Sequence, residues 1–183
     1  MRKILLGTIW VLMLAACKDQ AAEKTAPTAI AGESTSTPPP VEFADQKYID
    51  MGKKALEQFA AGNIDGWASM FAENIKFRWS AGDSLTGKAE VVKYWKDRRA
   101  NVIESIEVSN DIWLPVKINE PQSIESKGTW LLNWHRVKAT YKNKESLTFW
   151  VHIDMHYNNE GQVDEVIQYV DRAPIQAAVA KKK

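Results

Sequence analysis

GTWLLNWHRVKATYKNKESLTFWVHIDMHY, residues 128–157, is the stretch from which the architecture of this chain is most readily inferred. Two runs of alternating residues flank the polar segment 141–146, which predicts two antiparallel strands joined by a tight turn. A two-residue turn at Asn143-Lys144 would place Trp130 opposite Tyr157 and Trp134 opposite Ile153. The hairpin then has one aromatic and aliphatic face and one polar face.

This register sorts the side chains of the two strands into two sets. A slip by one residue would mix tryptophans with histidines on both faces, so the hydrophobic pattern favours the chosen pairing. The set expected to face the core is Trp130, Leu132, Trp134, Arg136, Val151, Ile153, Met155 and Tyr157, and the set expected to face outward is Leu131, Asn133, His135, His152, Asp154 and His156.

The rest of the chain from residue 45 supplies helices and further strands. Apolar spacing predicts a helix over 45–61, a second helix capped by Asn63, a strand at 75–79 and a helix over 88–102. Strands are expected at 106–118, 128–141, 147–157 and 163–170. Helices followed by a long antiparallel sheet predict an α+β fold, in which the N-terminal helices cover one face of a curved antiparallel sheet.

Several local motifs follow one another along residues 45–174. They are Ala61-Gly62-Asn63-Ile64-Asp65-Gly66-Trp67 after the first helix, the strand at 75–79, the Leu85-Thr86-Gly87-Lys88 turn into a helix, and the hairpin Glu160-Gly161-Gln162-Val163 leading to Tyr169-Val170-Asp171. In this order they resemble the nuclear transport factor 2-like superfamily, in particular its SnoaL-like and ketosteroid-isomerase-like branches. The resemblance implies a cone-shaped α+β barrel of the cystatin-like kind, whose open end holds a pocket, often in a homodimer.

The concave face of such a cone is where we expect a small apolar ligand to bind. Aromatic walls with a few polar groups are typical of small-molecule pockets. If Tyr157 faces Val163 in the last hairpin, the alternating set from Val163 to Asp171 shares this face. The predicted ligand-binding residues are Trp79, Trp134, Arg136, Tyr157 and Tyr169, with Asp171 near the rim and Arg136 orienting an acceptor on the ligand.

In catalytic members of the family, the resemblance implies, pocket carboxylates act as general acid or base, with apolar walls raising their pKa. Glu165 and Asp171 are the candidates here. Both have plainer interpretations, since Glu165 can emerge into solvent and Asp171 can pair with Arg172. The function is therefore open between a module that binds a small molecule or a protein, an isomerase, cyclase or hydrolase, and a structural envelope component.

Metal and cofactor chemistry is not indicated. The three histidines of the chain, His135, His152 and His156, belong with Asp154 to the outward set. The resemblance implies that this face is solvated or packed against a partner subunit. We therefore expect no metal site there. The chain has no Gly-rich phosphate loop, activated nucleophile or His-Glu-x-x-His spacing, and we expect no cofactor.

The N-terminus indicates where the protein is located. An apolar run of about 11 residues follows Arg2 and Lys3, which is too short for a bilayer span of roughly 20 residues and typical of a signal peptide. The segment Leu14-Ala15-Ala16-Cys17 resembles the lipobox of bacterial lipoproteins, in which the cysteine carries lipid. By this resemblance, Lys18 rather than Asp after Cys17 implies the outer membrane rather than the inner one. We expect an envelope lipoprotein that faces the periplasm or the cell surface.

Composition sets the remaining boundaries. We expect a signal peptide at 1–16, a disordered tether at 17–42 that is rich in Ala, Thr, Ser, Glu and Pro, one SnoaL-like domain at 43–178 and a basic tail at 179–183. With 24 basic and 23 acidic residues the chain is nearly neutral. A balanced charge gives no footprint for nucleic acid, so the expected partners are a membrane, a small apolar ligand and a second copy of the chain.

Overall fold

The computed structural model describes residues 37–121 and 127–180, which form one seven-stranded sheet with four helices. The strands follow the order β1-β4-β5-β6-β7-β2-β3. The strands are β1 (Val41–Phe43), β2 (Phe71–Trp79), β3 (Ser84–Thr86), β4 (Ile103–Ile118), β5 (Gly128–Tyr141), β6 (Ser146–Tyr157) and β7 (Val163–Tyr169), and the helices are α1 (Lys47–Ala60), α2 (Ile64–Ala68), α3 (Lys88–Asn101) and α4 (Arg172–Ala180).

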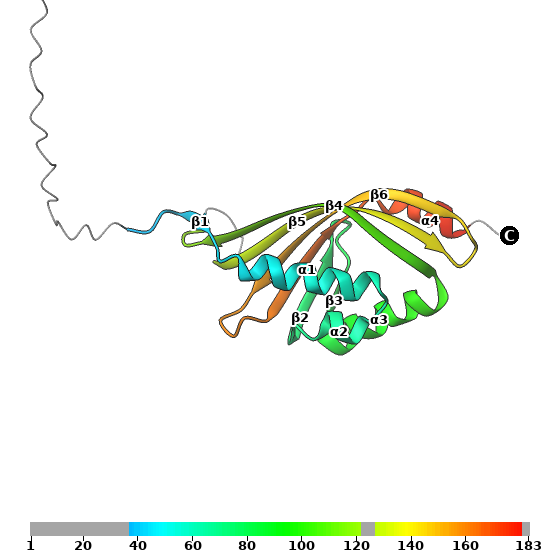
Figure 1. Cartoon of the computed structure of the whole chain (residues 1–183). Coiled ribbons are helices and arrows are strands. Elements are labelled where there is room, and N and C mark those ends of the chain that lie inside the picture. Colours follow the sequence, from blue (N-terminus) through cyan, green and yellow to red (C-terminus); the bar gives the residue numbers. More distant parts are fainter. Residues whose placement is uncertain (1–36, 122–126, 181–183) are drawn as a thin grey trace, which may run out of the picture. The chain divides into compact units, whose positions relative to one another are not determined.

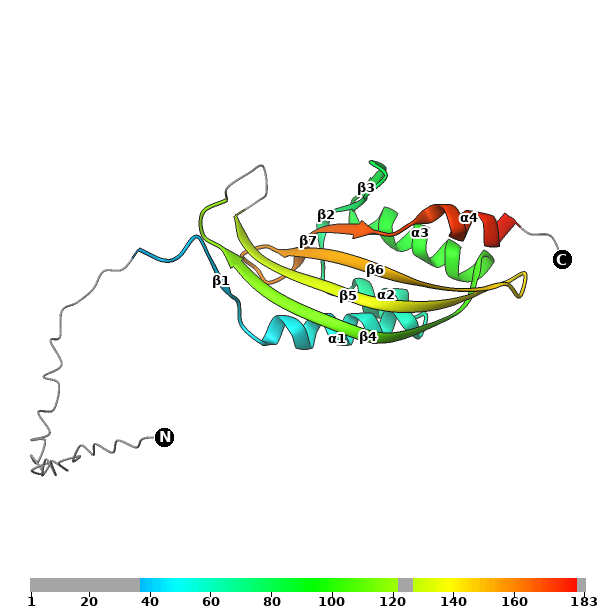
Figure 2. The same ribbon diagram turned by 90° about the horizontal axis from the view of Figure 1, so that it is seen from above.

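The sheet is curved, and α1, α2 and α3 lie on its concave side (Figure 1). We call this side the inner face, and the opposite side, along which β4, β5 and β6 run side by side in Figure 2, the outer face. The predicted α+β class is confirmed. The sheet is mixed rather than wholly antiparallel, because β2 pairs with β7 in parallel. No hairpin joins these two strands in the chain, so no turn imposes opposite directions on them.

The helical region forms for reasons visible in the sequence. Helix α1 ends before Gly62, whose φ of 83° is the left-handed conformation that glycine adopts readily. Asn63 then caps α2, and its Oδ1 accepts a hydrogen bond from the backbone N–H of Gly66 at 3.0 Å. Gly52 brings α1 close to the sheet, since a Cβ atom there would lie 2.6 Å from side-chain atoms of both Leu131 and Trp113.

The β5–β6 hairpin has a register one residue away from the predicted one. Trp130 pairs with His156 and Trp134 with His152. The reason is the turn, which contains the three residues 142–144 and is closed by a 2.9 Å hydrogen bond from the N–H of Tyr141 to the carbonyl of Glu145. Lys144 ends the loop at φ 73°, as the last residue of such three-residue loops commonly does. The extra loop residue inverts β5 relative to the prediction.

The inner face of β6 is as predicted, with Val151, Ile153 and Met155 facing the helices. On β5, in contrast, the inner residues are Leu131, Asn133 and His135, which are 0%, 1% and 3% exposed. The predictions that Trp130, Leu132, Trp134 and Arg136 face the inner side and that His135 faces outward are therefore wrong. Trp130 is nevertheless buried, at 4% exposed, beside His156 on the outer face. His152 and His156 do lie on the outer face, opposite Trp134 and Trp130.

A second irregularity changes the last strand. Tyr157 pairs with Val163 as predicted, but the pairing shifts at once, so that His156 opposes Glu165. Such a β-bulge sets two residues of one strand against one of its neighbour and reverses the alternation beyond it. Val166 and Gln168 consequently face the inner side, whereas Glu165, Ile167 and Tyr169, which were expected there, face outward.

The ends of the folded region extend slightly past the predicted domain. Strand β1 begins at Val41 and pairs with β4, so the fold includes the end of the predicted tether. Helix α4, which the sequence analysis did not predict, continues to Ala180. The predicted signal peptide, Cys17, most of the tether and the three terminal lysines lie outside the described residues. Within the described part, none of the helices is long and apolar enough to cross a membrane.

Candidate functional site

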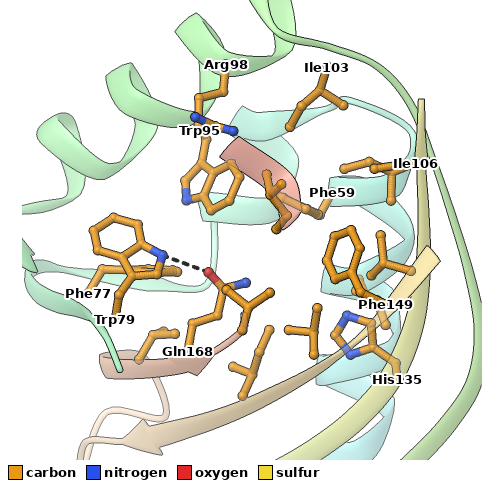
Figure 3. A pocket seen from close by; sticks show the side chains of 18 of the residues that line it. Phe59, Phe77, Trp79, Trp95, Arg98, Ile103, Ile106, His135, Phe149 and Gln168 are labelled. Carbon is orange, nitrogen blue, oxygen red and sulfur yellow. Dashed lines mark hydrogen bonds between the residues drawn. The ribbon is translucent and has the colours of Figure 1, made fainter. Parts of the chain in front are cut away.

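A cavity of about 210 Å³ lies between the inner face of the sheet and the helices (Figure 3). All four helices and the strands β2, β4, β5, β6 and β7 contribute to its walls. The lining is mostly apolar. Its aromatic members are Phe59, Trp67, Phe71, Phe77, Trp79, Tyr94, Trp95, Tyr141 and Phe149.

The rings from the helices and β2 pack against one another on one side of the cavity. Trp95 lies edge-on to Phe59 and Trp67, with ring centres 4.9 and 6.1 Å apart. Edge-to-face packing at these distances is favourable, so the wall is held in place before a ligand arrives. The indole N–H of Trp95 has no hydrogen-bond partner among the described residues.

Gln168 places an amide in this aromatic wall. The indole N–H of Trp79 donates to Oε1 of Gln168 at 2.8 Å (Figure 3). Because the oxygen accepts that bond, the amide orientation is fixed and the Nε2 hydrogens are left for other acceptors. Gln168 therefore offers hydrogen-bond donors at the cavity surface.

Arg98 brings a positive charge to the cavity lining from α3 (Figure 3). Its guanidinium carbon lies 5.7 Å from the ring centre of Tyr94, a distance at which a cation is attracted to an aromatic face. No carboxylate pairs with Arg98 among the described residues. Arg172 also lines the cavity, but its Nη1 donates to both carboxylate oxygens of Asp83 at 2.6 and 2.8 Å. Arg98 is thus the cation that a ligand can approach without displacing an ion pair.

His135 enters the cavity from β5 (Figure 3). Its Nδ1 lies 2.5 Å from Oδ1 of Asn133, which shares the inner face two residues earlier. The amide nitrogen of Asn133 donates to the carbonyl oxygen of Ile112 at 3.0 Å, so the Asn133 oxygen is left to accept. Nδ1 of His135 must then carry the proton in this pair.

Burial keeps His135 uncharged at neutral pH. Removal from water disfavours the imidazolium and lowers the pKa of His135 to about 4, while the charge of nearby Asp111 opposes this shift to a smaller extent. The cavity consequently contains a neutral imidazole whose second nitrogen, Nε2, carries a lone pair.

The predicted ligand-binding residues are only partly brought together. Trp79 lines the cavity as expected. Trp134 and Arg136 lie on the outer face because of the three-residue loop, and Tyr169, 43% exposed, lies there because of the bulge. Tyr157 faces inward but packs against Tyr48 of α1 at 4.7 Å and is not part of the cavity lining. Of the five predicted residues, the cavity lining therefore includes Trp79 alone.

The two candidate catalytic carboxylates lie outside the cavity. Glu165 forms a 2.6 Å ion pair with Arg78 and is on the outward side of β7. Asp171 is exposed and accepts a 3.0 Å hydrogen bond from the backbone N–H of Ala173 at the start of α4. The predicted Asp171–Arg172 ion pair does not form, because Arg172 pairs with Asp83.

The outer-face histidines each have a carboxylate partner. Nε2 of His152 lies 2.8 Å from Asp154, and Nδ1 of His156 lies 2.6 Å from Asp164. Among residues 37–121 and 127–180, no group of three or more histidine, cysteine or acidic side chains is arranged to hold a metal ion.

Sequence reasoning missed His135, Arg98 and Gln168. The signal for His135 was present in the second half of β5, where Val137, Ala139 and Tyr141 continue the alternation of His135 and are all buried. Position 136 and position 138, in contrast, are charged. The alternation of the whole strand, unlike that of its tryptophan-rich first half, indicates that His135 faces inward.

Comparisons with known proteins agree with this architecture. The model of the SnoaL-like domain family matches residues 53–166. None of the curated proteins matches the sequence significantly.

Several solved structures share the fold. One is a proposed polyketide cyclase from Xanthomonas campestris pv. campestris, with 14% identity, a TM-score of 0.60, and coverage of 74% of this chain and 98% of that chain. A nuclear transport factor 2-like protein of unknown function from Burkholderia pseudomallei has 15% identity, a TM-score of 0.59, and coverage of 75% and 100%. An LEH-like epoxide hydrolase from M. tuberculosis has 12% identity, a TM-score of 0.52, and coverage of 72% and 87%.

At such low identities these structures establish a common fold and no common activity. The family match, in contrast, covers most of the sheet and, among the helices that line the cavity, part of α1 and all of α2 and α3. The resemblance seen in the sequence is thereby confirmed, and the chain belongs to the SnoaL-like domain family.

Proposed function

We propose that this protein binds a small, mostly apolar molecule in the cavity of its SnoaL-like domain. The observation that carries the proposal is the cavity of about 210 Å³ with its wall of aromatic rings and few polar groups. Burial of apolar ligand surface contributes about 25 cal/mol per Å², and a preformed wall reduces the entropy lost on binding. Arg98 and Gln168 supply donors for an acceptor group on the ligand, the role first expected of Arg136.

A pair of variants at neighbouring positions tests the proposal. Ala139 lines the cavity, whereas Lys138 lies on the opposite face of the same strand and is exposed. Ala139→Phe should fill the cavity and abolish binding of naphthalene, measured by calorimetry, while Lys138→Phe should leave binding unchanged. Both variants must first be shown to unfold cooperatively, since overpacking costs about 1–3 kcal/mol. Equal binding by both variants, or no binding by the wild type, would refute the proposal.

We also propose that the domain is tethered to the bacterial cell envelope, in the outer membrane, by lipid on Cys17. The support is the apolar run that ends in Leu14-Ala15-Ala16-Cys17, followed by a polar segment suited to a tether. Several acyl chains on one cysteine would give stable attachment. Fractionation should find the wild type with membranes and Cys17→Ala in the soluble fraction. A Lys18→Ala variant should stay with membranes, and a membrane-bound Cys17→Ala variant would contradict lipid attachment.

The alternative, an isomerase, cyclase or hydrolase that uses a pocket carboxylate, has less support. Its two candidate residues are engaged elsewhere, Glu165 with Arg78 and Asp171 at the start of α4. We therefore favour binding over catalysis by these carboxylates.

A further inference from the structure

We propose that the cavity selects an apolar ligand that carries a hydroxyl group, as in an alcohol, phenol or enol, and that this hydroxyl donates a hydrogen bond to Nε2 of His135. The inference rests on the proposed binding function and names the chemistry of its ligand. It assigns a role to a buried polar pair, Asn133 and His135, that apolar binding alone does not use.

The first step of the argument is the tautomer of His135. The amide nitrogen of Asn133 is held by the carbonyl oxygen of Ile112 at 3.0 Å and lies 3.4 Å from that of Trp134. Both neighbours are acceptors, so the amide group that faces them is the NH₂ group, and its oxygen faces Nδ1 of His135 at 2.5 Å. An oxygen can only accept there, so Nδ1 donates and Nε2 of the neutral ring is an acceptor.

The second step is that this acceptor is unoccupied within the protein. Nε2 of His135 has no hydrogen-bond partner among the described residues, and the ring borders the cavity (Figure 3). The nearby wall consists of carbon-rich side chains such as Val137, Val151 and Phe149. A ligand without a donor would displace water from Nε2 and leave its lone pair unsatisfied, which disfavours that ligand relative to one with a hydroxyl group.

The third step is that the donors Arg98 and Gln168, which also line the cavity, do not occupy Nε2 of His135. Arg98 and the free amide hydrogens of Gln168 are donors, yet neither side chain forms a hydrogen bond to His135. These donors can bind an acceptor on the ligand at the same time. The cavity thus offers Nε2 of His135 as an acceptor, and Arg98 and Gln168 as donors, to a mostly apolar molecule.

A matched pair of probes tests the inference on the full chain carrying Cys17→Ala. 2-Naphthol and 2-methoxynaphthalene share the fused rings and an oxygen that can accept, but only 2-naphthol can donate. Calorimetry at pH 7 should give about tenfold tighter binding of 2-naphthol, the gain expected from one hydrogen bond. In His135→Phe this preference should disappear while 2-methoxynaphthalene still binds. His152→Phe, on the outer face, should retain the preference.

The outcomes separate the two proposals. If neither probe, nor naphthalene, binds to the wild type, the binding function itself is refuted. If both probes bind to the wild type with equal affinity, binding stands and the role of His135 is refuted. Should His135→Phe fail to fold, ¹⁵N NMR of the wild type decides. We expect an unprotonated Nε2 whose resonance shifts with 2-naphthol and not with 2-methoxynaphthalene, and a protonated Nε2 would overturn the inference.

Discussion

The neutral state of His135 couples the stability of the fold to pH. The pKa of His135 is about 4 in the folded chain and about 6.5 for an imidazole in water. Between these values the unfolded chain binds a proton that the folded chain does not, so the free energy of unfolding decreases as the pH falls through this range. Above pH 6.5 and below pH 4, His135 causes no further change in the free energy of unfolding with pH. The full decrease amounts to about 3 kcal/mol.

His135→Gln should remove this part of the pH dependence, since glutamine does not titrate and can still donate to Asn133. Urea unfolding followed by tryptophan fluorescence, at a series of pH values from 7.5 to 4, gives the free energy of unfolding of the wild type and of the variant as a function of pH. We expect the wild type to lose more stability than the variant as the pH decreases. Parallel curves would show that the imidazole is not kept neutral by burial.

Arg98 should control the preference of the cavity for acidic ligands. Its guanidinium group lines the cavity and has no carboxylate partner among the described residues. Arg98→Met keeps much of the side-chain volume and removes the charge, so 2-naphthoate should bind about tenfold more weakly while naphthalene binds as before. Arg136→Met, on the outer face, is the matched control. An equal effect of the two substitutions on 2-naphthoate would indicate a general charge effect rather than a contact.

At the scale of elements, the β5–β6 turn shows how one backbone conformation determines a register. Lys144 has φ 73°, which costs a residue with a Cβ atom about 1 kcal/mol. Its ammonium group also pairs with Glu104 at 2.6 Å, and both partners are partly solvated. Lys144→Gly and Lys144→Ala both remove this ion pair and differ only at Cβ.

We therefore expect Lys144→Gly to be more stable than Lys144→Ala by about 1 kcal/mol, the reverse of the order in a helix. Denaturant unfolding of the two variants measures the difference directly. If the alanine variant is the more stable, the left-handed conformation at Lys144 is not what closes the loop.

Most elements could be predicted from local patterns, whereas their alignment could not. Helix α2 and its Asn63 cap, or strand β5 with its bounds at 128 and 141, depend on residues close together in the chain. The register of β5 depends on a lysine in a conformation that glycine or asparagine usually signals. The bulge at Asp164 contains no Gly or Pro from which it could be predicted.

The candidate site inherits these limits. Trp79 could be predicted because its position follows from a single strand and the alternation within it. The remaining lining depends on which face of β5 and β7 turns inward, and both strands were inverted by one residue of irregularity. The charged side chains at positions 136 and 138 argue against the predicted register, whereas Trp130, Leu132 and Trp134 favour it.

At the scale of the whole molecule, the outer face carries a row of one isoleucine and three ring side chains across four strands. Ile112, Trp134, His152 and Tyr169 are successive cross-strand partners, with the rings of Trp134 and His152 stacked at 4.4 Å. Ile112 is 57% exposed, and neighbouring Trp150 is 53% exposed. Exposed apolar surface of this kind is typical of protein interfaces, and a second copy of the chain is the partner predicted from the sequence.

We propose that two copies of the chain pair through this surface. Trp150→Asp should then weaken self-association by about tenfold or more, because it places a charge on the proposed contact. Sedimentation velocity over a range of concentrations measures this effect. Ala100→Asp, an exposed position on α3 away from the sheet, introduces the same charge as a control. A wild type that is monomeric at every concentration would exclude the homodimer.

The three-residue loop between β5 and β6 also has a meaning for insertions and deletions. Successive side chains of a strand point to opposite faces of the sheet. Whether the number of residues in the loop is odd or even therefore determines which side chains of β5 face the cavity. Deleting one of residues 142–144 would exchange the interior of the cavity for the exterior along β5, bringing Arg136 inward and turning His135 out, without substituting any residue that lines the cavity. Adding or removing two residues would leave the same side chains of β5 facing the cavity. In a sheet built this way, an odd change of length in one exposed turn does more to the chemistry of the pocket than most substitutions within it.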